Sequence, residues 1–502
     1  MKPEEWNEGL NHLDPDLVEE YIAKKDECTQ KKKRAKPYWF AAVAAVLGLV
    51  ILMSAVLPGL QRSVVQGTEP GEIPSPGAIQ NPGELHLANL VGSPQYPTMV
   101  QKPDEENFGG DYAAYSAAYR QWTDDQKLQY DQPDNYADSL TGFFKRSIAQ
   151  FTSTEENQVY SPLNLYMALA MVAETTDGNS RQQLLNLLGL DSIEQLRTQA
   201  GHVWNAHYTN DGETTLLLGS SLWLDDAFSF HQNTVDLLAD SYYASAFHGD
   251  LGTAEMNAQL QTWINAQTGG LLREQAGNLK LTPRTAFALA STVYFSAGWQ
   301  TEFSETRNTR ERFHCKDYDQ VTTFMNRSFN GAYYWADHFG AVRLNLSGNN
   351  AMWLILPDKG VSMETVISSG EYLEMTLDPM NWENQQEMKI NLSLPKFDIS
   401  SQMDLVEGMK EMGVTDVFDS NRSDFSPMTD ENGLYIGKID HAARVAIDEE
   451  GVVAAAFTVV TVYGNGASAE QKEINFTLDR PFLFIVSSRD NLPLLAGVVN
   501  EP

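Results

Sequence analysis

A run of about 20 residues without a charged side chain, Tyr38–Leu57, separates a short N-terminal part of the chain from a long C-terminal part. As a helix rising about 1.5 Å per residue, the run would span roughly 30 Å, the thickness of a bilayer's hydrocarbon core. Basic residues cluster just before it: Lys31, Lys32, Lys33, Arg34 and Lys36. By the positive-inside rule, we predict a cytoplasmic segment over residues 1–36, a transmembrane helix over residues 37–60 and an extracellular remainder.

A cleaved signal peptide is the competing interpretation of this run. Its charged leader would occupy all of residues 1–36, which is too long, and no small-residue cleavage site follows the apolar stretch. We therefore expect a single-pass protein of the cell membrane, with its N-terminus in the cytoplasm and its main domain extracellular.

The composition excludes several classes of protein. The 502 residues include 67 acidic and 35 basic side chains, and the net charge of −32 argues against a nucleic-acid partner, because phosphate binding needs basic patches. The two cysteines, Cys28 and Cys315, lie on opposite sides of the predicted membrane, which excludes a disulfide framework and a Cys-rich zinc site. We expect no metal, no cofactor and a monomer.

No catalytic constellation is found in the sequence. The nine histidines form no H-x-x-x-H pair, no G-x-S-x-G elbow is present, and the glycines near Gly464 lack the third glycine of a dinucleotide loop. The acidic run Asp448-Glu449-Glu450 is typical of a solvated turn. The sequence therefore predicts a protein that is not an enzyme.

Two further parts follow the predicted membrane helix. Residues 61–134 begin with a stretch rich in proline, glycine and serine, which predicts an extracytoplasmic linker. Its second half leaves two alternatives, a surface helix packed on the following domain or a tether, because aromatic residues recur there at helical spacing: Tyr112, Tyr115, Tyr119 and Trp122. Residues 135–502 contain no long linker or repeat, so we predict one α+β domain.

Periodicity assigns some elements of this domain. Short apolar runs predict strands at Ala351–Leu356, Lys389–Leu394 and Pro481–Val486. Helical patterns cover Leu163–Ala173 and Met256–Ala266. The mixture of both kinds along one stretch favours a single mixed fold.

The segment Gly451–Ala469 is unusual because it has no charge although charged segments flank it on both sides. Its first half consists of alanine and β-branched residues, and its second half is rich in glycine, asparagine, serine and alanine. An exposed apolar loop is a liability, whereas a buried strand would need a more regular end. The composition suits a segment that is exposed and later becomes a strand; a hairpin with a long turn is the alternative.

Short motifs in a fixed order connect this segment to a known family. They are Asn157-Gln-Val-Tyr-Ser161-Pro162, Trp263-Ile-Asn265, Val293-Tyr-Phe295 with Gly298-Trp299, Leu394-Pro-Lys-Phe397, His441-Ala-Ala443, Asp448-Glu-Glu-Gly451, Arg480-Pro-Phe-Leu-Phe484 and Gly497-Val-Val-Asn500. Together they resemble the serpins, the serine protease inhibitors, over residues 135–502. The resemblance implies three β-sheets, eight or nine helices and an exposed reactive-centre loop.

The resemblance also implies suicide inhibition. A protease cuts the loop and forms an acyl-enzyme, and the loop then inserts as a new strand in the central sheet, carrying the protease with it. The partner is a serine protease, with a cysteine protease as the alternative. Such a mechanism needs a native state that is kinetically trapped.

The hinge of the loop matches the family only in part. Gly451 matches the hinge glycine, and Ala454, Ala455 and Ala456 match the small residues that enter the sheet first. Val452 stands where inhibitors usually carry Thr or Ser, and Phe457 stands where they carry a small residue. These two departures keep open a non-inhibitory binding module as an alternative function.

The resemblance assigns two further groups of residues. One is the place where insertion begins, with an expected Glu449–Lys396 ion pair: Trp299, Lys396 and Glu449. The other is a polar cluster under the centre of the sheet: Ser161, Asn164, Ser291 and His441. The family usually has Ser at the position of Asn164 and Asn at that of Ser291, so the two residue types look exchanged.

The scissile bond is predicted from two counts along the loop. They give Asn465, Gly466 and Ala467 as candidates for the residue before the cut. Small or amide side chains there suit an elastase-like or subtilisin-like protease rather than a trypsin-like one. We thus predict a membrane-anchored serpin of bacterial type; besides the binding module, a protease-sensing receptor that signals through residues 1–36 is a third alternative.

Overall fold

The computed structural model describes residues 87, 89–97, 99–133, 135–152, 154–452 and 472–502. All the described residues belong to one compact unit, Glu72–Pro502. The predicted segments 1–36 and 37–60 lie outside the described residues. Within the described part, no helix has both the length and the apolar character needed to cross a membrane.

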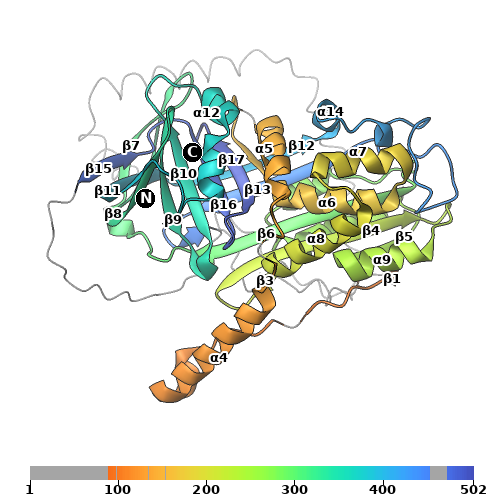
Figure 1. The fold of residues 1–502 in the computed structure, drawn as a ribbon, viewed down its shortest axis with the longest axis horizontal. Helices are drawn as coiled ribbons and strands as arrows, with labels where there is room; N and C mark the ends of the chain where they lie inside the picture. The colour runs from red at the N-terminus through yellow and green to blue at the C-terminus, as the bar shows by residue number, and fades with distance from the viewer. Residues whose placement is uncertain (1–86, 88, 98, 134, 153, 453–471) are drawn as a thin grey trace, which may run out of the picture. The chain divides into compact units, whose positions relative to one another are not determined.

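Eight strands form sheet 1 (Figure 1). Its order is β1 (Leu90–Gly92), β5 (Ala244–Gly249), β4 (Thr214–Asp225), β6 (Phe287–Gly298), β14 (Gly451–Val452), β13 (Asp440–Ile447) and β12 (Phe397–Asp404), with β3 (Thr209–Asn210) paired to β4. The two-residue strand β14 lies between β6 and β13, and among the described residues β6 and β13 do not pair with each other.

Nine strands form sheet 2. Its order is β15 (Glu473–Thr477), β11 (Gln385–Pro395), β8 (Asp319–Trp335), β9 (Phe339–Asn345), β10 (Ala351–Pro357), β16 (Phe482–Ser487), β17 (Pro493–Val499) and β2 (Gln158–Tyr160), with β7 (Thr309–His314) paired to β8. Every residue of β10, β16 and β17 is buried, which explains their continuous apolar sequences.

Most of the helices cover these two sheets. They are α4 (Tyr112–Tyr130), α5 (Leu140–Phe151), α6 (Pro162–Thr175), α7 (Gly178–Leu188), α8 (Ile193–His207), α9 (Gln232–Tyr242), α10 (Ala254–Gln267), α11 (Arg273–Asn278), α12 (Met363–Ser369), α13 (Glu371–Leu377) and α14 (Val406–Glu411). Helix α6 is apolar on all sides and nearly every residue of it is buried, as expected of a helix inside the core. Helices α6, α8 and α9 lie over sheet 1 in Figure 1.

The structure confirms the α+β class and the predicted elements and differs in two details. The strands predicted at Ala351–Leu356, Lys389–Leu394 and Pro481–Val486 are β10, β11 and β16, and the two predicted helices are α6 and α10. Instead of three separate sheets there are two hydrogen-bonded networks, because the long strand β8 pairs with β7 and β11 and, through its last residues, also with β9. Eleven α-helices are described rather than eight or nine, since α4 precedes the predicted domain and several others are short.

Part of the predicted linker 61–134 is folded. Its described residues include strand β1 at the edge of sheet 1 and the 19-residue helix α4, so the surface helix is the alternative that the structure supports. Asp111 caps the N-terminus of helix α4, and its side chain accepts hydrogen bonds from the backbone N–H groups of Ala113 and Ala114.

Candidate functional site

The first part of the candidate site is the predicted hinge, where the chain turns from β13 into β14. The Asp448 carboxylate accepts hydrogen bonds from the backbone N–H groups of Glu450, at 2.9 Å, and Gly451, at 3.1 Å. This tight turn sends the chain back antiparallel to β13, so that Val452 pairs with Ile447 on one side and Ala297 of β6 on the other.

Glycine is required at the start of β14 because the backbones approach so closely. A Cβ atom at Gly451 would lie 2.4 Å from the Ala297 carbonyl oxygen and 2.8 Å from the Gly298 Cα, both backbone atoms that cannot swing away. Val452 is only 1% exposed, so the structure accommodates the β-branched residue that departs from the family pattern. The hinge thus already forms a strand between β6 and β13.

An ion pair lies beside the hinge, at the end of sheet 1 where β14 begins. We call this end the top of the sheet. The Lys396 Nζ lies 2.5 Å from a Glu449 carboxylate oxygen, which is the expected pair, and the Asn308 side-chain amide donates a hydrogen bond to the other carboxylate oxygen. The Glu449 side chain is 9% exposed and that of Lys396 36%. Burial opposes ionisation of Glu449, but the hydrogen bonds from Lys396 and Asn308 outweigh it and hold its pKa below the ordinary value.

Trp299 fastens the same turn to the end of β6. Its indole N–H donates to the Asp448 carbonyl at 2.8 Å, and its backbone N–H donates to the Glu450 carbonyl at 2.8 Å. The ring is buried and makes an edge contact with Phe303, whose own N–H donates to the Glu449 carbonyl. All three predicted sheet-opening residues, Trp299, Lys396 and Glu449, therefore meet at one end of β14.

The second part of the site is the polar cluster at the start of α6. Ser161 caps this helix by accepting the Asn164 backbone N–H, and its hydroxyl donates to the Leu494 carbonyl at 2.7 Å. The Ser161 backbone N–H donates to Nε2 of His441 on β13 at 3.1 Å. Asn164 reaches β6, where its amide donates to the Ser291 carbonyl at 3.2 Å and its side-chain oxygen accepts the Ser291 hydroxyl.

The four predicted cluster residues are thus joined in one chain, from His441 to Ser161, from Ser161 to Asn164 and from Asn164 to Ser291. The exchange of Asn and Ser keeps a hydrogen bond between the helix and β6, with the partners in reversed positions. His441 is 4% exposed, and its burial lowers its pKa to about 4. Because its Nε2 accepts a hydrogen bond, the ring is neutral and protonated on Nδ1.

A pocket lies between these two parts of the site. It opens between Val293 of β6 and Ala442–Arg444 of β13, with Ser161, Asn164 and Leu495 on one side and Thr268, Leu271 and Leu272, which follow α10, on the other. We call the space between β6 and β13 beyond β14 the slot. Its lining combines apolar residues with polar ones, among them Ser161 and Asn164 of the polar cluster.

The structure places some of the predicted residues and leaves others outside the described part of the chain. Gly451 and Val452 form β14, whereas Ala454, Ala455, Ala456 and Phe457 and the scissile-bond candidates Asn465, Gly466 and Ala467 are not described. Sequence reasoning missed Asn308. No motif marks it, because its contact with Glu449 depends on where β7 begins beside β8. No group of residues that could hold a metal ion is found in the described ranges.

Comparison with known proteins decides the family. The family model described as Serpin (serine protease inhibitor) matches residues 140–502. The chain belongs to the serpin family. Among curated serpins, Serpin-ZX of Arabidopsis thaliana is 27% identical over 373 residues, covering 70% of this chain and 93% of its own. Human Serpin B3 is 25% identical over 401 residues, covering 74% of this chain and all of its own length.

Solved serpin structures share the fold. The thermophilic serpin Tengpin in its native state has a TM-score of 0.66 at 24% identity and covers 74% of this chain and 95% of its own. Thyroxine-binding globulin in complex with thyroxine has a TM-score of 0.62 at 21% identity and covers 75% of this chain and 99% of its own. Membership of the family supports a protease-inhibitor role in general terms, although the second neighbour shows that the fold also serves a protein that binds a small molecule.

Proposed function

We propose that this serpin is a membrane-anchored, extracytoplasmic inhibitor of a serine protease, acting by loop cleavage, acyl-enzyme trapping and loop insertion. One observation carries the proposal: the hinge begins as a strand between β6 and β13, and the slot opens ahead of it. β6 and β13 do not pair with each other in the described part of the chain, so a loop that is cut farther along could extend β14 between them once they move apart.

The register of β14 supports the proposal. Val452 lies opposite Ala297 and Ile447, so a strand that continued in the same register would bring Ala456 opposite Val293 and Ala443. These two residues border the slot, and alanine is small enough to fit between them. Along the same strand, Thr458 would come opposite Ser291 and His441, which are members of the polar cluster.

The proposed membrane anchor is supported by the sequence. The uncharged run Tyr38–Leu57 with basic residues before it supports a single-pass helix and an extracellular serpin domain. The test is fractionation of cells that express the full chain, followed by protease treatment of intact cells. A membrane-bound chain whose serpin domain is digested from outside supports the anchor; a domain found in the soluble fraction or protected inside the cell refutes it.

The target is proposed as elastase-like or subtilisin-like, from the residues Asn465, Gly466 and Ala467. The experiment is incubation of residues 87–502 with serine proteases of these two classes, a trypsin-like protease and a cysteine protease. A denaturing gel then shows whether a covalent complex forms. A complex with the first two classes supports the proposal, and sequencing of the released peptide identifies the scissile bond.

Absence of a complex with every protease would instead favour the non-inhibitory binding module. The receptor alternative depends on residues 1–36. If deletion of that segment changes neither inhibition nor the cell's response to proteases, the receptor alternative is rejected.

A further inference from the structure

The segment that precedes the serpin match at residue 140 is itself fastened to sheet 1. Strand β1 pairs antiparallel with β5, with Leu90 opposite Phe247 and Gly92 opposite Ala246. A Cβ on Gly92 would lie 3.1 Å from the Ala246 Cβ, so glycine allows the strand to lie this close. We call β1, α4 and the described residues between them the clasp.

Tyr96 anchors the clasp next to its strand. Its ring packs against Trp204, Tyr208 and Tyr243 with centroid distances of 5.6–5.9 Å, and its hydroxyl donates to the Tyr243 carbonyl at 3.0 Å. Burial among these rings raises the pKa of Tyr96 well above the ordinary value, so the side chain stays neutral. This contact joins the clasp to α8 and to the start of β5.

A second anchor holds α4 at the turn between β3 and β4. The Lys102 backbone N–H donates to the Asp211 carbonyl at 2.7 Å, and its Nζ lies 3.0 Å from Glu213. The Lys102 ammonium also lies 5.8 Å from the ring of Trp122, a buried residue of α4. The clasp is therefore attached to β5, β3 and β4, which all lie on the β6 side of the slot.

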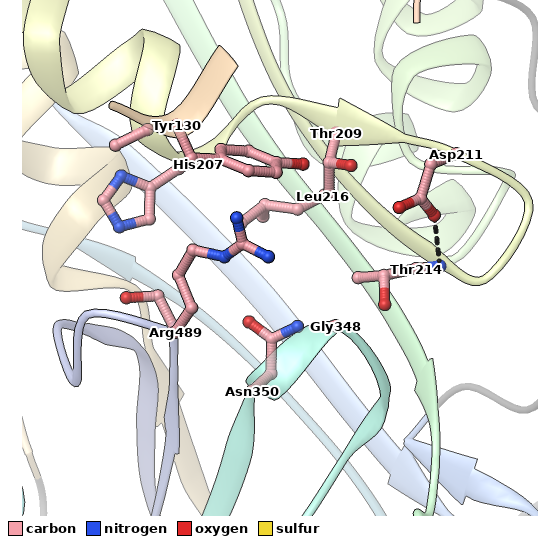
Figure 2. A pocket seen from close by; sticks show the side chains of 11 residues that line it. Tyr130, His207, Thr209, Asp211, Thr214, Leu216, Gly348, Asn350 and Arg489 are labelled. Carbon is pink, nitrogen blue, oxygen red and sulfur yellow. Dashed lines mark hydrogen bonds between the residues drawn. The ribbon is translucent and has the colours of Figure 1, made fainter. Parts of the chain in front are cut away.

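Tyr130, the last residue of α4, contacts sheet 2. The Arg489 guanidinium lies 3.6 Å from the ring centroid of Tyr130 (Figure 2). Figure 2 shows this contact in a pocket between Thr209, Asp211 and Thr214 of sheet 1 and two turns of sheet 2. One of these turns, with Gly348 and Asn350, joins β9 to β10; the other, with Ser488 and Arg489, joins β16 to β17.

Sheet 2 is in turn tied to the β13 side of the slot. β2 pairs with β17, and its Val159 N–H donates to the Ser401 hydroxyl of β12 at 3.2 Å. A new strand needs about 4.8 Å of width, so β6, β4 and β5 must move relative to β13, β12 and the strands attached to them. The Tyr130–Arg489 contact is one of several that join the β4 side to sheet 2. Ser347 of the β9–β10 turn also hydrogen-bonds the Thr214 hydroxyl and the Glu213 carbonyl. The contact through the clasp adds to those that such a movement must break.

We propose that the clasp is a brake on the opening of the slot and so regulates loop insertion. The inference rests on the proposed function only in assuming that the slot takes up a strand. The brake slows insertion before the loop is cut and leaves recognition by the protease unchanged.

The test measures slot opening without a protease. A synthetic peptide with the sequence of residues 451–463 is added to residues 87–502, and its uptake is followed on native gels. We expect Arg489→Ala and Tyr130→Leu to take up the peptide about two- to fivefold faster than the wild type, the equivalent of one lost cation–π contact. Tyr96→Ala should accelerate uptake more, by about tenfold, because it releases a packed ring and a hydrogen bond.

Tyr112→Ala is the matched control, because it removes a 72% exposed tyrosine from the same helix and should leave the rate unchanged. Circular dichroism checks that each variant is folded. Equal or slower uptake by Arg489→Ala, Tyr130→Leu and Tyr96→Ala, or no uptake by any protein, overturns the brake. If the three variants take up the peptide faster but the chain traps no protease, the brake is supported and the inhibitor function is rejected. If their uptake is unchanged but the chain forms complexes with a protease, the inhibitor function is supported and the brake is rejected.

Discussion

The two ends of the route that the loop would follow are built from different chemistry. At the top, Glu449 and Lys396 form an ion pair whose lysine is about one-third exposed. Beneath the centre of sheet 1, Ser161, Asn164 and His441 are buried and neutral, and they use hydrogen bonds to reach β6, β13 and β17.

This difference determines how much free energy is needed to separate β6 from β13 at each end. Glu449 is buried, but Lys396 is partly exposed and water can solvate its ammonium when the pair opens, so breaking the pair should cost nearer the roughly 1 kcal/mol of a surface pair than the ~3–5 kcal/mol of a fully buried one. A buried polar group that loses its partner costs about 1–3 kcal/mol, so the cluster can be disturbed only if new partners replace the old ones. The top would therefore be the weaker closure, and the cluster would hold the sheet until an inserting strand supplied new hydrogen bonds.

The largest effect is expected at the hinge, where the route begins. Gly451→Val places side-chain atoms against the Ala297 and Gly298 backbones, so β14 cannot occupy its place between β6 and β13. Insertion then loses the race against hydrolysis of the acyl-enzyme, and the moles of serpin consumed per mole of protease inactivated should rise at least about tenfold. Gly437→Val is the control, because a Cβ added there would make only an ordinary contact with the Tyr435 ring, at 3.9 Å. An unchanged ratio in Gly451→Val would mean that the hinge needs no close approach.

As the pH falls, the polar cluster should lose its contribution to stability before the Glu449–Lys396 pair does. Burial lowers the His441 pKa from 6.5 to about 4, so the unfolded chain binds the proton more readily than the folded one. Stability is therefore full above pH 6.5 and falls by roughly 3 kcal/mol as the pH drops to about 4. Denaturant unfolding at several pH values measures this loss, and His441→Gln should flatten the curve between pH 6.5 and 4. The same slope in the variant would assign the loss to other groups.

Changes to the exchanged pair, Asn164 and Ser291, should have an intermediate effect on the free energy of unfolding. Ser291→Ala leaves the Asn164 side-chain oxygen without its hydroxyl donor and should lower the free energy of unfolding by about 1–2 kcal/mol. The double variant Asn164→Ser with Ser291→Asn restores the residue types usual in the family and should recover most of that loss. If the double variant is less stable than Ser291→Ala, the exchange is not equivalent to the usual arrangement.

The smallest effect is expected at the top. Glu449→Gln removes the charge but keeps an acceptor for Asn308, and it should cost at most about 1 kcal/mol at neutral pH. The Glu449 pKa is lowered, so the contribution is present above the ordinary value of 4.5 and is lost as the pH falls through the folded pKa. A cycle with Lys396→Met, repeated at high salt, isolates the pair. A coupling above about 3 kcal/mol would make the top the stronger closure.

The sequence predicted the elements whose cause is local. The apolar runs of β10 and β16 and the apolar helix α6 are specified by neighbouring residues, and all three were found where expected. The Glu449–Lys396 pair was also predicted, because the family resemblance assigns both positions.

Contacts set by long-range register could not be predicted. Asn308 meets Glu449 only because β7 begins where it does, and Tyr130 meets Arg489 only because α4 lies against turns hundreds of residues away. The pattern at Tyr112 indicated a helix but not the surface on which it packs, since amphipathic spacing identifies a face and not its partner. The loop after Val452 and the predicted membrane helix lie outside the described residues and remain predictions.

Unfolding of residues 87–502 before and after a single cut within Gly464–Ala469 tests the insertion mechanism most directly. If residues 451–463 enter the slot as a strand, the cleaved domain gains a full ladder of hydrogen bonds and should unfold at a much higher temperature than the intact domain. Calorimetry on both forms provides the comparison. Equal unfolding temperatures would show that the cut loop does not insert, and would contradict the account.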